Sequence, residues 1–132
     1  MCKLRDIILI DNYVSEGTPL NRHSFVVIDE VGDEIQGVPY DFVCNVMSSF
    51  KNETQKARKL SYPGNFPITA SDAPVSGGNG KDGYIKADQF YYFNKSKIDY
   101  TVIGSVNIDV FDELLNFIEN GDFEIASITD NL

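Results

Sequence analysis

The residues best suited to chemistry stand around the one histidine of this chain, His23 in the stretch NRHSFVVIDE. Histidine takes up and releases protons near neutral pH, because its unperturbed pKa is about 6.5. Arg22 directly precedes it, and a guanidinium group can donate two hydrogen bonds to phosphate oxygens. Ser48 and Ser49 add hydroxyl groups that can donate to the same kind of oxygen. Together these residue types could move a proton beside a bound phosphate.

Each of these residues also has an ordinary structural interpretation. A histidine at the entry to a strand is often a surface residue, and Arg22 could pair with one of the 20 acidic residues. Serines at a strand end are typical of turns. Cys44 falls inside an expected strand, which favours a place in the core over a role as nucleophile. No Gly-x-Ser-x-Gly sequence is present, so the serines do not indicate a hydrolase triad.

A basic cluster directly follows the two serines. It comprises four of the eleven basic residues, namely Lys51, Lys56, Arg58 and Lys59. Their segment, FKNETQKARK, has too little apolar content to bury one face of a helix, so we expect a mobile loop. Such a cluster is often only a solvated loop, but here it could line a groove beside the serines. Tyr62 and Phe66 follow and could stack on unpaired bases. Both could instead be core residues, an interpretation that is favoured for Phe66.

The charge of the chain is unevenly distributed. The net charge is −9, yet residues 1–97 hold all eleven basic residues and twelve acids, whereas residues 98–132 hold eight acids and no Lys or Arg. The acidity therefore belongs to the C-terminal part. The remainder is near neutral with local basic clusters, which leaves a nucleic-acid partner open.

The length and composition favour a single domain over residues 1–132 that buries its own core. Hydrophobic residues make up 42%, and no apolar run is long enough for a membrane span. The start MCKLRD has no apolar signal region, and Cys2 and Cys44 have no metal-ligand spacing. We therefore expect a cytoplasmic protein with two reduced thiols, no metal, no cofactor and no membrane contact.

The pattern of apolar residues predicts a mainly β domain with a C-terminal helix. A β-region of about 4–105 is followed by a helix at about 107–120, with Asn107 as N-cap, and by an acidic tail at 121–132. Strands are expected in RDIILID, HSFVVID, YDFVCNVMSS, YIKADQFYYF and YTVIGSV, with a kinked edge strand in LSYPGNFPI. The glycine-rich stretch TASDAPVSGGNGKDG is expected to be an exposed loop. This order favours a small barrel with a helix packed on it.

Four stretches in this order resemble the PemK/MazF family, the toxins of bacterial toxin–antitoxin pairs. They are LRDIILID, RHSFVVI, FVCNVMSS and GYIKADQFYYFNKSKI, and the helix IDVFDELLNFIE falls where the family has its C-terminal helix. The resemblance covers about residues 4–120. It implies an SH3-like, partly open β-barrel that forms a homodimer. It also implies cleavage of single-stranded RNA without a metal ion, restrained by an antitoxin that could be a protein or an RNA.

The resemblance suggests roles for individual residues. Many family members open the second strand with a catalytic Arg-Pro pair, where this chain has His23-Ser24 after Arg22. The third strand of the family commonly ends in Thr-Ser, where this chain has Met47-Ser48-Ser49, so either Ser48 or Ser49 takes the place of the threonine. We therefore expect His23, Ser48 and Arg22 to be catalytic. The RNA-binding residues are expected to be Ser49, Lys51, Lys56, Arg58, Lys59 and Tyr62.

The departure from Arg-Pro also supports a second hypothesis. The chain could be a non-catalytic SH3-like module that has lost its active site and is kept for contacts with nucleic acid or protein. The retained Arg22, His23, Ser48 and basic cluster favour the nuclease instead. Incubation with single-stranded RNA in EDTA would separate the two.

Overall fold

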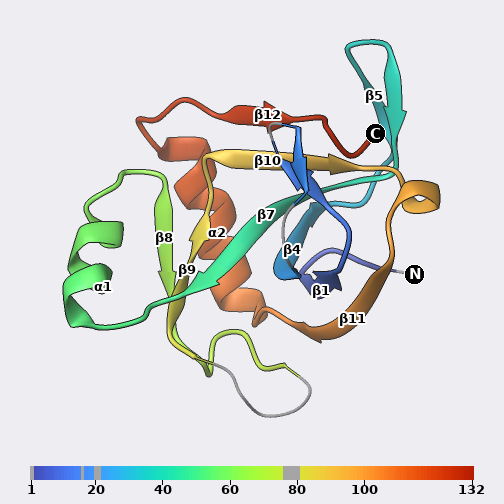
Figure 1. Ribbon diagram of the computed structural model, residues 1–132. Coiled ribbons are helices and arrows are strands. Elements are labelled where there is room, and N and C mark those ends of the chain that lie inside the picture. The colour runs from blue at the N-terminus through green and yellow to red at the C-terminus, as the bar shows by residue number, and fades with distance from the viewer. Residues whose placement is uncertain (1, 16, 20–21, 76–80) are drawn as a thin grey trace.

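The computed structural model describes residues 2–15, 17–19, 22–75 and 81–132, and over these residues the chain is mainly β with two α-helices (Figure 1). The elements in chain order are β1 (Asp6–Ile10), β2 (Val14–Ser15), β3 (Thr18–Pro19), β4 (His23–Asp29), β5 (Asp33–Ile35), β6 (Val38–Tyr40), β7 (Phe42–Ser49), α1 (Glu53–Leu60), β8 (Asn65–Ile68), β9 (Gly83–Lys86), β10 (Gln89–Phe93), the 3-10 turn η1 (Lys95–Lys97), β11 (Tyr100–Ser105), α2 (Ile108–Asn120) and β12 (Ala126–Ile128). The predicted mainly β class with a helix near the C-terminus is confirmed.

The main sheet is mostly antiparallel and runs in the order β11-β1-β4-β7-β10-β12. β7 is long enough to pair with β10 through its first half and with β9 through its second half. β8 pairs with β9 alone and is thus an edge strand, as predicted from its prolines. No pairing between described strands closes the sheet into a barrel. The expected SH3-like barrel remains a prediction.

Two core clusters lie on opposite faces of this sheet. One, called here the aromatic cluster, contains Cys2, Ile8, Ile10, Tyr13, Phe25, Val27, Phe42, Cys44, Val46, Tyr91, Phe93 and Ile98. The other, called the helix-side cluster, contains Ile7, Val26, Phe66, Ile68, Ala73, Ile85, Ala87, Val106, Phe111 and Leu114. β4 sends Phe25 and Val27 to one and Val26 to the other, because side chains alternate along a strand. Because β4 is buried on both faces, its sequence contains a continuous apolar run.

Both cysteines are buried in the aromatic cluster, as expected for Cys44. Phe66 is likewise buried, in the helix-side cluster. Of the aromatic block at 90–93, Tyr91 and Phe93 are core residues. None of the helices in the described chain combines the length and the apolar character needed to cross a membrane.

The mobile loop expected at 50–59 is wrong, because this segment contains α1 (Figure 1). No residue of α1 is buried, so the helix does not depend on an apolar face. Its start is held by two hydrogen bonds: the Asn52 side chain accepts from the Gln55 amide at 2.8 Å, and the Gln55 side chain accepts from the Lys51 amide at 2.6 Å. Glu53 in its first turn and basic residues in its last turn also complement the helix dipole.

The predicted N-cap position of Asn107 is confirmed, but its side chain contacts a distant part of the chain. Asn107 occupies the N-cap position of α2 but makes no side-chain capping hydrogen bond. Instead its amide group donates to the Ser71 carbonyl at 3.0 Å, and its backbone N–H donates to the Asp72 carbonyl at 2.9 Å. A tertiary contact has replaced the local one, and it ties residues 71–72 to the start of α2.

Two other segments expected to be irregular have defined positions. In the predicted loop at 69–83, Val75 forms a β-bridge with Gly104, while residues 76–80 lie outside the described residues. The acidic segment at 121–132 returns to the sheet, where β12 pairs in parallel with β10. The segment after β12 lies beside the β2–β3 hairpin, where Asp130 Oδ2 accepts a hydrogen bond from the Gly17 amide at 2.9 Å.

Candidate active site

An open cavity of about 470 Å³ lies where the start of β4 meets the end of β7. Its lining residues are Ile7, Leu9, Arg22, His23, Ser24, Met47, Ser48, Ser49, Lys51, Gln55, Ile68, Ala73, Val75, Lys81 and Ile103. All three residues predicted to be catalytic are among them, together with Ser49 and Lys51 from the predicted RNA-binding set. This cavity is called the groove below.

Strand pairing explains why these residues meet. β4 and β7 are antiparallel, with Ser24 opposite Met47, so the first residues of β4 lie beside the last residues of β7. Residues 22–24 and 47–51, which are far apart in the sequence, therefore reach the same edge of the molecule.

The histidine and the first serine share one face of the strand pair. Phe25 pairs with Val46, and both belong to the aromatic cluster. Since side chains alternate along a strand, His23 and Ser48 lie on this same face, two positions nearer the groove. The His23 ring packs edge-on against Tyr13, with ring centroids 5.7 Å apart at 75°. The imidazole is therefore partly buried and held at the margin of the aromatic cluster.

The opposite face of the same strand ends carries Ser24 and Ser49 by the same alternation. Ser49 is exposed, and Ser24 is half-buried. Hydroxyl groups thus reach the groove from both faces of the sheet. Ser24 was not among the residues predicted for the site, although its place directly after His23 was a signal that it would share this edge.

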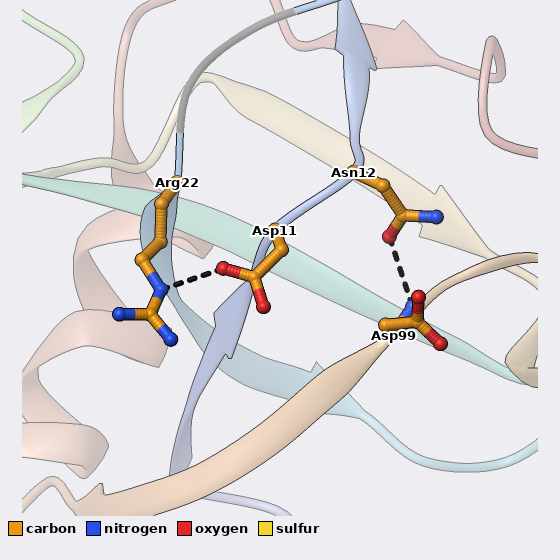
Figure 2. A network of polar contacts seen from close by, with 4 residues as sticks. All are labelled: Asp11, Asn12, Arg22 and Asp99. Carbon is orange, nitrogen blue, oxygen red and sulfur yellow. Dashed lines mark hydrogen bonds and ion pairs between the residues drawn. The ribbon is translucent and has the colours of Figure 1, made fainter.

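Arg22 forms an ion pair with Asp11, with 2.6 Å between Nε and Oδ1 (Figure 2). Asp11 directly follows β1 and Arg22 directly precedes β4, and these strands end with Ile10 opposite His23. Both side chains of the pair are more than half exposed, so the pair adds little to stability. Only Nε of the guanidinium group makes a hydrogen bond to the described residues, and the two terminal nitrogens are available to an anion.

A second hydrogen bond fixes the turn at residues 11–12, directly after β1. Asn12 Oδ1 accepts a hydrogen bond from the Asp99 amide at 2.9 Å, which joins the end of β1 to the residue before β11 (Figure 2). The carboxylate that orients Arg22 therefore stands on a rigid corner and not on a free loop.

The predicted RNA-binding residues do not all reach the groove. Lys51 lines it, and Lys56 lines a neighbouring cavity. Arg58 and Lys59 lie in the last turn of α1, and Tyr62 follows the helix with 53% of its surface exposed. These last three residues do not line the groove.

Lys81 is a groove residue that the sequence did not indicate. It lies two residues before β9, and the pairing of Gly83 with Ser49 brings it to the site. Gly83 permits this close approach, because a side chain there would collide with the Ser48 carbonyl oxygen. The sequence gave one signal for this approach, which is the glycine that stands between Lys81 and the aromatic strand that follows.

Tyr13 packs edge-on against the ring of His23. Burial, reinforced by the nearby Tyr91 hydroxyl, raises the pKa of Tyr13 to about 12. The phenol consequently stays protonated and uncharged at neutral pH. Among the described residues, no group of three or more His, Cys, Asp or Glu side chains is placed to hold a metal ion.

Comparison with models of known protein families finds no match for this chain, and comparison with curated proteins finds none either.

Proposed function

We propose that this protein is an endoribonuclease that cleaves single-stranded RNA without a metal ion, similar to PemK/MazF toxins. The observation that carries the proposal is the groove. Two separate stretches of the sequence carry residue types suited to RNA cleavage, and the fold brings them to this one cavity. Five of these residues line it, namely Arg22, His23, Ser48, Ser49 and Lys51.

RNA carries its own nucleophile, so the protein has to move protons and stabilise charge. The 2′-oxygen attacks the adjacent phosphorus as its proton leaves, the bond from phosphorus to the 5′-oxygen breaks, and the 5′-oxygen gains a proton. In this proposal His23 performs one of the two proton transfers. Arg22 and Ser48 donate hydrogen bonds to the phosphate oxygens while negative charge develops on them.

The remaining predicted residues would bind the RNA chain on either side of the reacting bond. Ser49 and Lys51 act inside the groove, and Lys56 acts beside it. Arg58 and Lys59 extend the positive charge along α1, and Tyr62 offers an exposed ring for base stacking.

The same proposal includes the finer features that the resemblance implies. These are an SH3-like, partly open barrel, a homodimer, a cytoplasmic location and restraint by a protein or RNA antitoxin. Half-buried Phe90 and Tyr92 support a dimer contact, because they line an apolar cavity of about 260 Å³ against Leu115 and Ile118 of α2.

The test is incubation of the purified protein with mixed single-stranded RNA in EDTA, followed by analysis of the new ends. We expect a 2′,3′-cyclic phosphate and a 5′-hydroxyl. The His23→Ala protein, prepared in parallel, controls for contaminating nucleases. Activity that requires a metal, or products with 5′-phosphates, would exclude this mechanism.

The non-catalytic binding module has one structural observation in its favour. Arg22 already pairs with Asp11 and the His23 ring already packs on Tyr13, so both residues have structural contacts. A module of this kind would bind RNA or a protein in the groove and leave RNA intact in the same assay.

A further inference from the structure

A second cavity, of about 310 Å³, adjoins the groove at the start of α1. Its lining residues are Phe50, Lys51, Asn52, Glu53, Lys56, Lys81 and Asp82. Lys51 and Lys81 line both cavities, so they form the wall between them. An RNA chain that leaves the groove past these two lysines enters the second cavity.

The lysines of this cavity are not neutralised by direct ion pairs. Within the described parts of the chain the single ion pair is Arg22–Asp11, so no carboxylate oxygen lies within 4.0 Å of the amino groups of Lys51, Lys56 and Lys81. Two carboxylates do line the cavity. Asp82 already accepts a hydrogen bond from the Ala70 amide at 3.0 Å, and Glu53 complements the helix dipole. Three lysines therefore face the cavity without a contacting anion.

Part of the lining of the second cavity is held by packing and hydrogen bonds. The Phe50 ring packs on the buried Tyr84, with centroids 5.3 Å apart. The Lys56 amino group lies 5.7 Å from the centre of the Phe50 ring, which favours a cation over that ring. The Lys51 backbone is held by Gln55 at the helix start. These contacts restrict the side chains of Phe50 and Lys56 before a ligand arrives, which lowers the entropic cost of binding.

We propose that the second cavity binds the phosphate of the nucleotide next to the one that reacts, with Lys81 and Lys56 as its ligands. This inference rests on the proposed function, because it extends the same RNA chain beyond the groove. Lys81 then directs the chain from one cavity to the next. It is a substrate-binding residue that the sequence resemblance did not indicate.

The test measures binding of uncleavable RNA, with a 2′-O-methyl group on every nucleotide, to the full chain at several salt concentrations. Lys81→Ala and Lys56→Ala should each weaken binding of a tetranucleotide about three- to tenfold and reduce the slope of log K against log salt by about 0.7. A dinucleotide, which fills the groove alone, should lose less affinity in the Lys56→Ala variant, because Lys56 lines only the second cavity. Lys97→Ala removes an exposed lysine in η1 that lines neither cavity, and it should match the parent.

The outcomes separate this inference from the nuclease proposal. Unchanged affinity and salt slope in both variants would overturn the inference even if the parent protein cleaves RNA. Weakened binding by the variants of a parent that never cleaves would support the cavity and exclude the nuclease. Loss of binding to a glutamate-rich peptide, with RNA binding unaffected, would assign the lysines to an acidic protein partner and overturn the inference. If Lys81→Ala fails to fold, Lys81→Gln with a normal melting curve gives the same measurement.

Discussion

Asn131 forms two hydrogen bonds with the backbone of Val14, a residue 117 positions earlier in the chain. Its Oδ1 accepts from the Val14 amide at 2.6 Å, and its Nδ2 donates to the Val14 carbonyl at 2.9 Å. The side chain thus substitutes for a neighbouring strand. Val14 follows Tyr13, whose ring packs against His23. The C-terminal end of the chain therefore helps to fix the residue behind the histidine.

Replacing Asn131 with alanine should lower the free energy of unfolding by about 1–3 kcal/mol, because Val14 would lose both backbone partners at a site where Asn131 is only 7% exposed. Urea unfolding followed by circular dichroism measures this change. Asn120→Ala is the matched control, since Asn120 is exposed and its side chain bonds only within α2. A change no larger than that of the control would mean that the two hydrogen bonds are replaced by water.

Replacing His23 with alanine should reduce the rate of RNA cleavage by about 10²–10⁴-fold, the usual scale for loss of one general acid or base. Affinity for uncleavable RNA should change little, because a neutral imidazole adds no charge attraction. Single-turnover cleavage and equilibrium binding measure the two quantities separately. Equal cleavage rates in the variant and the parent would leave His23 with only its packing role against Tyr13.

Substitution of Arg22 and substitution of Asp11 should have opposite effects on the affinity for RNA. Arg22→Ala removes a phosphate ligand and should weaken binding clearly, whereas Asp11→Asn removes a competing negative charge and should tighten it about two- to fivefold at low salt. Stability should change by only about 0–1 kcal/mol in both variants, because the pair is exposed. Titrations with uncleavable RNA measure the affinities. Equal weakening by both variants would show that the ion pair itself builds the site.

Stability should fall as the pH rises above about 9. Burial raises the pKa of Cys44 well above its ordinary value of 9 and that of Tyr13 from 10 to about 12. In alkaline solution the unfolded chain therefore releases these protons first, and the folded state holds more of them. Tyr13→Phe keeps the ring and should remove the part of the decline between about pH 10 and 12. Urea unfolding at increasing pH tests this, and an equally steep decline in the variant would contradict it.

Local patterns in the sequence were sufficient for the strands that surround the groove. The run HSFVVID predicts β4 because β-branched residues continue through it, and Phe111 and Leu114 show the helical spacing that buries α2. α1 was missed because its stability depends on hydrogen bonds at its ends and not on an apolar face. Asn107 was correctly expected at the N-cap of α2, but its side chain bonds a distant carbonyl and not the first turn of the helix.

The site itself could be predicted only in part. His23 and Ser48 were identified by their chemistry, and the pairing of β4 with β7 brings them to one edge. Lys81 reaches the groove through the pairing of β9 with β7, and no local pattern records a contact of that kind. The hydrogen bonds of Asn131 likewise depend on an approach of two segments from opposite ends of the chain.

The pairing of β1 with β11 bears on how the protein is made. Asp6 pairs with Ser105, so β1 leaves the ribosome about 100 residues before the strand that covers one of its edges. Ile103 of β11 lines the groove together with Ile7 and Leu9 of β1, so part of the groove lining is missing until β11 emerges. A chain still under synthesis, or one stalled before residue 100, consequently has no complete groove. Any activity of the groove therefore begins only after β11 has been released.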